Sequence, residues 1–264
     1  MMKPFFSIIV VSFNAEKLIE ETIRSVLMQD FADFEIVVKD ACSTDMTLDK
    51  IPKDDRIFTY VSKDSGIYFG MNEAISHAKG KYLLFLNCGD VLAAPDILST
   101  IYETAKTKDE KITVIYGDYS RDGIRAKQPS VLSKFYLYRT PLCHQTVFFS
   151  NALFKQFGLY DTQYRILADY DFTLKTFLGN AEYIYCPTVV SNYLGGGVSE
   201  SKQGIEIKTR ERKKICHIYF SNNEQKKYSF LLKLSMRKFR QKIVVSSPQL
   251  IRRLYRGLVN IINR

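Results

Sequence analysis

Apolar and polar residues in the first half of the chain alternate between two periodicities. Short, nearly continuous apolar runs predict strands buried on both faces, and stretches with apolar residues at i, i+4, i+7 and i+8 predict helices. The predicted strands are Phe6–Phe13, Phe34–Lys39, Ile57–Val61, Tyr82–Leu86 and Val114–Tyr116, and the predicted helices are Glu16–Gln29, Ile67–Lys79 and Ile97–Lys106. This alternation predicts an α/β fold with a mostly parallel sheet and helices on both faces.

The periodicity weakens beyond Tyr119. We expect helices at Asn151–Phe157 and Asp169–Phe177 and a strand at Glu182–Cys186. Gly80 is expected to end the helix that precedes it. With 264 residues, 46% of them hydrophobic, the chain can form one large domain, alone or with a short appendage.

The net charge of +10 is concentrated near the carboxyl terminus. Residues 225–264 hold 11 of the 38 Lys and Arg residues and none of the 28 acidic ones, which leaves 27 basic and 28 acidic residues in the first 224. We therefore predict a roughly neutral domain over residues 1–220 and a basic tail over 221–264. Apolar and basic residues recur at helical spacing in 226–245 and again after Pro248, which predicts two amphipathic helices.

The basic tail admits three interpretations. A basic face without acids beside an apolar face suits an anionic membrane surface, which residues 225–264 would contact. The apolar faces would instead be covered if the helices pack back on the domain. Electrostatic binding of nucleic acid is a distant third interpretation, and no nucleic-acid partner is expected because the domain resembles no nucleic-acid-binding fold.

Cysteine usage and hydropathy indicate a cytosolic protein. The five cysteines are odd in number and scattered, with no C-x-x-C pair, so we expect reduced thiols rather than disulfides or a zinc site. The apolar run near the amino terminus is too short for a convincing signal peptide and predicts a buried strand. The sequence has no uncharged apolar stretch of about 18 residues, so no transmembrane helix is predicted.

Polar residues follow the first four predicted strands, namely Asn14, Asp40, Asp64 and Asp90. The carboxyl ends of parallel strands meet at one edge of a sheet, where ligands bind. A single acid there is as readily a turn residue or helix cap, but four such strand ends favour a site.

Carboxylates repel a bare diphosphate and bind it through Mn²⁺ or Mg²⁺. The absence of G-x-G-x-x-G after the first strand, and of a P-loop motif, disfavours a Rossmann dehydrogenase or P-loop enzyme.

Several ordered blocks resemble the family 2 glycosyltransferases, which have the GT-A fold. Ser7–Thr47 (SIIVVSFNAEKLIEETIRSVLMQDFADFEIVVKDACSTDMT) is similar to the opening of the family. Asp64–Leu92 (DSGIYFGMNEAISHAKGKYLLFLNCGDVL) resembles the branch that builds bacterial surface polysaccharides such as O antigen and capsule, and LCHQTVFF (Leu142–Phe149) and ILADYDF (Ile166–Phe172) match its later blocks. The resemblance implies a GT-A nucleotide-diphospho-sugar transferase fold, with a nucleotide-sugar half at about 1–118 and an acceptor half at about 119–220.

The resemblance also implies roles for individual residues. Asp40 matches the acid that contacts the nucleobase, Asp90 matches the metal-binding acid at the end of Asn87-Cys88-Gly89-Asp90, and Asp169 matches the catalytic base. The donor-facing blocks further contain Asn14, Asp64, Asn72, Asn87 and Gly89. The possible acceptor-side residues are His144, Gln145 and Asp171, of which Asp171 is also the second choice for the base.

The implied reaction moves a sugar from a nucleotide sugar, expected to be a UDP-sugar, to an acceptor hydroxyl with inversion. Mn²⁺ or Mg²⁺ is the expected cofactor, and a glycan acceptor, lipid-linked at the inner face of the cytoplasmic membrane, is the expected partner. The chain would thus be a cytoplasmic, peripheral membrane protein. A sugar nucleotidyltransferase is the nearest alternative, although Ser12–Leu18 lacks the glycine-rich basic loop typical of that class.

The sequence departs from the family pattern at four places. Ala41 stands where glycine is usual, Ser65 replaces a usual Lys or Arg, Phe69-Gly70 replaces a common Asp-Ala, and Ala168 replaces a frequent Glu. The change at Ser65 bears most on phosphate contacts. Simpler interpretations also remain open for residues in the matching blocks, because Asp169 can cap the helix after it, His144 can be structural, and Tyr68 can be a core residue.

Overall fold

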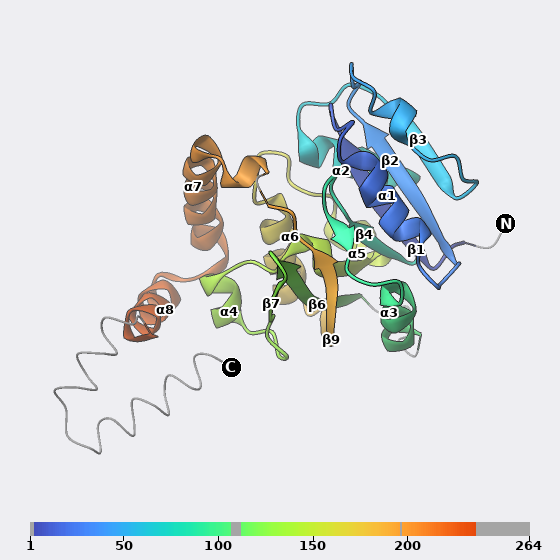
Figure 1. Ribbon diagram of the computed structural model, residues 1–264. Coiled ribbons are helices and arrows are strands. Elements are labelled where there is room, and N and C mark those ends of the chain that lie inside the picture. Colours follow the sequence, from blue (N-terminus) through green and yellow to red (C-terminus); the bar gives the residue numbers. More distant parts are fainter. Residues whose placement is uncertain (1–2, 107–111, 196, 236–264) are drawn as a thin grey trace.

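The computed structural model (Figure 1) describes residues 3–106, 112–195 and 197–235, which form an α/β fold. Its helices are α1 (Ile19–Leu27), α2 (Ile67–His77), α3 (Ile97–Ala105), α4 (Lys134–Arg139), α5 (Asn151–Phe157), α6 (Ala168–Leu178), α7 (Lys202–Tyr219) and α8 (Asn222–Ser235). Its strands are β1 (Phe6–Ser12), β2 (Phe34–Asp40), β3 (Ile57–Val61), β4 (Tyr82–Phe85), β5 (Val91–Leu92), β6 (Thr113–Arg121), β7 (Ile124–Ala126), β8 (Val147–Ser150) and β9 (Glu182–Asn192). The predicted α/β class is confirmed.

A single nine-stranded sheet runs through the described residues in the order β3-β2-β1-β4-β8-β6-β9-β5, with β7 paired to β6. The neighbours β3, β2, β1 and β4 are parallel, as the alternating pattern predicts. The second half of the sheet is mixed, because β6 and β9 are parallel, whereas β8 pairs antiparallel with both β4 and β6, and β5 pairs antiparallel with β9.

Strands β1 and β4 are buried on both faces, which explains why they are almost continuously apolar. Phe6, Ile8 and Val10 of β1 pack in one cluster with α1 and α3, whereas Ile9 of β1 packs in a second cluster with α2, α5 and α6. Alternate residues of a strand point to opposite faces, so an inner strand covered on both sides needs an apolar residue at nearly every position.

Gly80 has a different role from the predicted helix end, because α2 ends at His77. A Cβ at Gly80 would lie 2.4 Å from the backbone nitrogen of Ser7 and 2.6 Å from the carbonyl carbon of Phe6. Its own N–H donates to the Ser7 hydroxyl at 2.8 Å. Glycine is therefore required where the chain entering β4 crosses close to β1.

The two carboxyl-terminal helices described, α7 and α8, lie at the opposite end of the molecule from β3 (Figure 1). Ile215 and Phe220, in α7 and just after it, are buried in the core. The first turns of α8 pack on α4, where Tyr228 contacts the rings of Phe135 and Tyr138. This part of the predicted tail thus packs on the domain, and residues 236–264 lie outside the described part of the chain.

None of the helices in the described ranges combines the length and the apolar character that a membrane span requires.

Candidate functional site

The carboxyl ends of β1 and β2 carry polar side chains that tie two loops together. Asp40 is fully buried and accepts hydrogen bonds from the Ser12 hydroxyl at 2.7 Å and from the N–H and hydroxyl of Ser43 at 2.7 and 2.6 Å. Asn14 adopts a left-handed conformation with φ of 49°, and its Oδ1 accepts from the N–H of Thr44 at 2.9 Å. Both predicted donor residues therefore hold the loops that shape this edge of the sheet.

The next strand end, that of β3, is organised by a buried lysine that the sequence did not single out. Lys39 is fully buried, and its Nζ lies 3.1 Å from Oδ2 of Asp64 and 3.6 Å from Oε2 of Glu73. The same Nζ donates to the carbonyl of Ser62 at 2.8 Å, and Asp64 also accepts from the N–H of Gly66 at 3.0 Å. Asp64 thus lies at the predicted edge of the sheet, and the buried ammonium group of Lys39 compensates its negative charge.

The loop after β4 turns sharply and directs Asp90 toward the second half of the chain. Gly89 has φ of 100°, a conformation that favours glycine. Its N–H donates to Oγ1 of Thr22 at 2.8 Å, and the N–H of Asp90 donates to the carbonyl of Asn87 at 3.0 Å. This loop leaves the sheet beside β1, where the strand order reverses, and such a point is where open α/β sheets bind ligands.

The carboxylate of Asp90 is 5% exposed and is contacted from the second half of the chain. Nε2 of Gln145 donates to its Oδ2 at 3.0 Å, and the N–H of Leu194 lies 3.4 Å from its Oδ1. The thiol of Cys143 donates in turn to Oε1 of Gln145 at 3.0 Å. Burial raises the pKa of Asp90, although His144 and Gln145 oppose that shift. A bound cation would favour the ionised carboxylate.

A chain of side chains joins the Asp90 loop to Asp169. Nδ2 of Asn87 lies 2.9 Å from Nε2 of His144, and Nδ1 of His144 lies 3.7 Å from Oδ2 of Asp169. Tyr68 donates its hydroxyl to Oδ1 of Asp169 at 2.8 Å. The structure therefore brings together residues that are 82 positions apart in the sequence, from Asn87 to Asp169.

The turn that carries His144 and Gln145 is held in place by hydrogen bonds from a buried glutamine, Gln128. Gln128 accepts from the N–H of Cys143 at 3.2 Å and donates to Oγ1 of Thr146 at 2.8 Å. These bonds lie on either side of the two site residues. The turn therefore has a fixed backbone that presents both side chains to the Asp90 loop.

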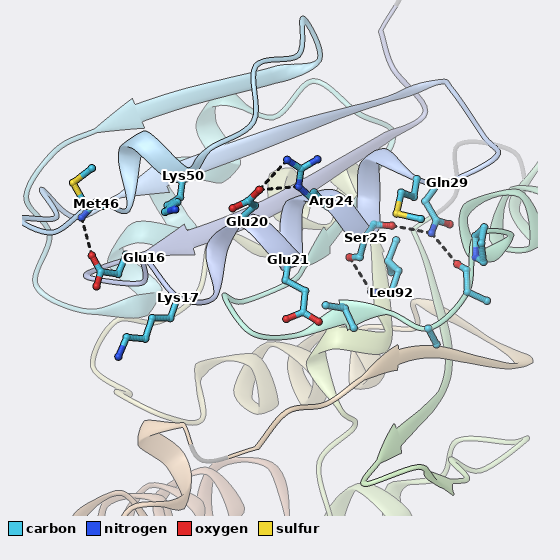
Figure 2. Close-up of a pocket in the computed structure, with 15 residues that line it drawn as sticks. Glu16, Lys17, Glu20, Glu21, Arg24, Ser25, Gln29, Met46, Lys50 and Leu92 are labelled. Atoms are coloured by element: carbon cyan, nitrogen blue, oxygen red, sulfur yellow. Dashed lines mark hydrogen bonds and ion pairs between the residues drawn. The ribbon is translucent and has the colours of Figure 1, made fainter.

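A concave surface lies away from these residues, along α1 (Figure 2). This cavity of about 900 Å³ is lined by residues of α1 and by neighbouring segments that include Glu16, Met46 and Leu92. Figure 2 shows acidic and basic side chains mixed along it, with Glu20 paired to Arg24. None of the predicted site residues is among the described residues that line it, so its size alone gives no reason to place the chemistry there.

The side chains around Asp90 suit a metal that substrate helps to bind. In the described ranges, no three His, Cys, Asp or Glu side chains are grouped so as to hold a metal ion by themselves. Mg²⁺ and Mn²⁺ are commonly held by one or two carboxylates together with substrate phosphates. Oδ1 of Asn87 is buried and has no hydrogen-bond partner in the described structure. This unpartnered oxygen, in the same tight loop as the Asp90 carboxylate, fits an oxygen-ligated cation.

The sequence model of Glycosyl transferase family 2 matches residues 7–163, more than half of the chain. The chain belongs to this family. The glycosyltransferase is 31% identical over 205 residues to a PGL/p-HBAD biosynthesis glycosyltransferase of Mycobacterium bovis. The matched region covers 74% of this chain and 80% of the relative. A Bacillus subtilis relative named for teichuronic acid biosynthesis is 39% identical over 93 residues, 33% of this chain and 37% of the relative. Family membership favours a glycosyltransferase over the nucleotidyltransferase alternative.

Solved structures confirm the GT-A-type fold of the glycosyltransferase. S. aureus TarS 1-349 in complex with UDP-GlcNAc gives a TM-score of 0.58 at 19% identity, covering 98% of this chain and 88% of that one. The mannosyltransferase PcManGT from Pyrobaculum calidifontis, in complex with GDP-Man and Mn²⁺, gives 0.59 at 16% identity, covering 100% and 88%. At these identities the likeness concerns the fold.

Asn72 and Asp171 of the glycosyltransferase have partners other than the residues around Asp169. Both polar atoms of Asn72 bond the backbone of Tyr160, at 2.8 and 3.0 Å, so this side chain fixes a loop. Asp171 is directed at the hydroxyl of Tyr219 in α7, and burial raises its pKa. Two residues differ by about 200° around a helix, which is why Asp171 and Asp169 face different neighbours.

Tyr68 is a functional candidate that the sequence left as a core residue. It is 7% exposed, so the core assignment is right, but its hydroxyl contacts both Asp169 and the carbonyl of Ile166 at 2.8 Å. Its place in the Gly-Ile-Tyr block was the available signal. The contact itself joins residues 101 positions apart, which no local pattern reveals.

Proposed function

We propose that this glycosyltransferase moves a sugar from a nucleoside diphosphate sugar, a UDP-sugar by our expectation, to the hydroxyl of a glycan acceptor. The observation that carries the proposal is the connected set Asn87–His144–Asp169, with Asp90 in the same loop as Asn87. It brings a candidate diphosphate-binding loop and a candidate base to one place. Relatives named for PGL/p-HBAD and teichuronic acid biosynthesis support a role in bacterial surface glycan synthesis, with O antigen and capsule as candidate products.

Asp90 and Asn87 would hold Mn²⁺ or Mg²⁺ through the Asp90 carboxylate and the unpartnered Oδ1 of Asn87. When bound there, the cation would offset the negative charge that develops on the departing diphosphate. Gln145 would keep the Asp90 carboxylate oriented through its bond to Oδ2. Asn14, Asp40, Asp64 and Gly89 would contribute by shaping the donor edge of the sheet.

Asp169 would accept the proton of the acceptor hydroxyl as that oxygen attacks the anomeric carbon. The tyrosine hydroxyl at Oδ1 and the imidazole at Oδ2 leave limited freedom for its carboxylate. Attack from the face opposite the departing diphosphate predicts inversion at the anomeric carbon. His144 and Gln145, on one turn, would separate the donor side from the acceptor side.

The test is nucleoside diphosphate release from a panel of nucleotide sugars, with and without Mn²⁺ or Mg²⁺ and with a lipid-linked acceptor supplied. We expect metal-dependent release from one donor that is lost in Asp90→Ala and retained in Asp96→Asn, a variant of an exposed aspartate nearby. Release that ignores both metal and Asp90→Ala would refute the role of this loop.

A second comparison distinguishes the two candidate bases. We expect Asp169→Asn to lower turnover by about 10²–10⁴-fold, the usual contribution of a general base. Asp171→Asn should leave turnover near wild type, apart from any loss of stability. Near-wild-type transfer by Asp169→Asn would exclude this residue as the base.

We further propose that the protein acts as a peripheral protein at the inner face of the cytoplasmic membrane, where a lipid-linked acceptor would be found. The face of α8 away from α4 exposes Phe230, which is 61% exposed, together with Lys226, Lys227 and Lys233. Apolar and basic side chains on one surface suit anionic lipid.

Flotation with anionic liposomes tests the membrane proposal. The full chain should float, and a chain ending at Ser235, which keeps the packing of α8 on α4, should float less. Flotation that persists on neutral liposomes, or fails for the full chain, would argue against an electrostatic membrane role.

A further inference from the structure

The segment that leads into α6 is held by an acid from a distant helix. The residue before the helix, Leu167, gives no side-chain cap. Glu211 of α7, which is 7% exposed, accepts hydrogen bonds from three consecutive backbone N–H groups, those of Arg165 at 2.6 Å, Ile166 at 3.1 Å and Leu167 at 3.0 Å. One carboxylate thus satisfies the donors that precede the helix, and its negative charge lies at the favourable end of the helix dipole.

The same segment is held from the opposite side by α2. The hydroxyl of Tyr68 contacts the carbonyl of Ile166 at 2.8 Å as well as Oδ1 of Asp169. The N–H of Ile166 is bonded to Glu211 and its carbonyl to Tyr68. The backbone that sets the position of Asp169, two residues into the helix, is therefore fixed on both sides.

Helix α7 is a rigid base for this contact. Ile215, one turn after Glu211, is fully buried. Arg212, the next residue in the chain, donates from its guanidinium to the carbonyl of Tyr138, and the guanidinium lies 5.5 Å from the ring centre of Tyr170 in α6. These contacts fix the turn of α7 that carries Glu211.

We propose that Glu211 is a positioning residue that sets the geometry of the general base Asp169. The inference rests on the proposed function, in which Asp169 accepts the proton of the acceptor hydroxyl. Glu211, like Asp169, lies beyond residues 7–163, the segment that the family model matches. The carboxylate contacts backbone only, and its effect on the reaction passes through the start of α6.

Glu211→Gln is the variant that tests this role. The amide keeps the size of the side chain but offers one acceptor oxygen in place of two, and its NH₂ group faces backbone donors. A displacement of a catalytic group by about 1 Å can lower turnover by about 10²-fold. We expect kcat to fall by about 10–100-fold while KM for the nucleotide sugar stays within about twofold. Glu206→Gln, an exposed residue on the same helix, is the matched control and should keep wild-type values.

A double-mutant cycle with Asp169→Asn separates positioning from a general structural role. If Glu211 acts through Asp169, the Gln variant should lower the residual kcat of the Asp169→Asn protein by less than about twofold. A multiplicative loss in the double variant, or a rise in donor KM that parallels a loss of thermal stability, would overturn the positioning role. So would a kcat for Glu211→Gln equal to that of Glu206→Gln. Failure of Asp169→Asn itself to lower kcat would instead exclude Asp169 as the base, which is the part of the proposed function on which this inference rests.

Discussion

Tyr68→Phe removes one oxygen atom from the site and leaves the ring packing in place. Burial, with a contribution from the neighbouring Asp169 carboxylate, raises the pKa of Tyr68 well above its ordinary value of 10.0. The hydroxyl is therefore protonated and acts as a donor at any pH at which the enzyme would be assayed. It lies 2.8 Å from both Oδ1 of Asp169 and the carbonyl of Ile166.

The expected loss follows from the charge of the acceptor. A hydrogen bond to a charged group contributes about 1.5–3 kcal/mol, against about 0.5–1.5 kcal/mol for a neutral pair. Tyr68 has one proton, and the carboxylate is the stronger acceptor. We expect Tyr68→Phe to lower the free energy of unfolding by about 1.5–3 kcal/mol. If about 1.4 kcal/mol of this interaction is realised in the transition state, kcat falls about tenfold.

The chain contains a matched control. Tyr116 is fully buried, and its hydroxyl donates at 2.8 Å to a neutral acceptor, the carbonyl of Pro129. Urea denaturation and steady-state kinetics of Tyr116→Phe should give the smaller loss of stability with unchanged kcat. The reasoning would be refuted if Tyr68→Phe cost no more stability than Tyr116→Phe and left kcat unaltered.

Three further substitutions test the framework around the site. Lys39→Met leaves the partly exposed carboxylates of Asp64 and Glu73 without their buried cation and should cost about 1.5–3 kcal/mol of unfolding free energy, whereas the exposed Lys63→Met should cost less than about 0.5 kcal/mol; equal losses would contradict the ion-pair account. The bond from Lys134 lowers the pKa of Glu224 from 4.5 to about 2, so the stability from this pair is present above pH 4.5 and is lost as the pH falls toward 2. Because Glu224 is 32% exposed, the loss should be at most about 1 kcal/mol, and thermal melts of Glu224→Gln should lack that part of the pH dependence. Gly80→Ala should lower the melting temperature sharply because its Cβ meets backbone at 2.4 Å; a normal melting curve would show that the crossing can widen.

The sequence predicts the elements whose signal is local. The first four strands and the helices between them appear because a continuous apolar run indicates a strand covered on both faces, as β1 and β4 are. The short strand β8 was missed because four residues leave no periodicity to detect. The hairpin of β6 and β7 had an overlooked signal, since Asp122-Gly123, both with positive φ, is a typical two-residue hairpin turn.

In the candidate site, too, only the features with a local sequence signal could be predicted. Asp90 and Asp169 were found from motifs, but the contacts that orient them come from residues far away in the chain. Glu211 is 44–46 positions from its three backbone partners, and Lys39 is 25 positions from Asp64. Such contacts depend on how helices pack across the sheet, and no local pattern in one sequence encodes that packing.

The single sheet that joins both halves of the molecule limits how the enzyme can move. β4 of the first half of the chain bonds directly to β8 of the second half, and β5, which follows Asp90, bonds to β9. A hinge between the halves would have to break these ladders in every catalytic cycle. Substrate entry and product release therefore call for small loop movements above a sheet that stays intact, and the two halves should unfold together in one cooperative transition.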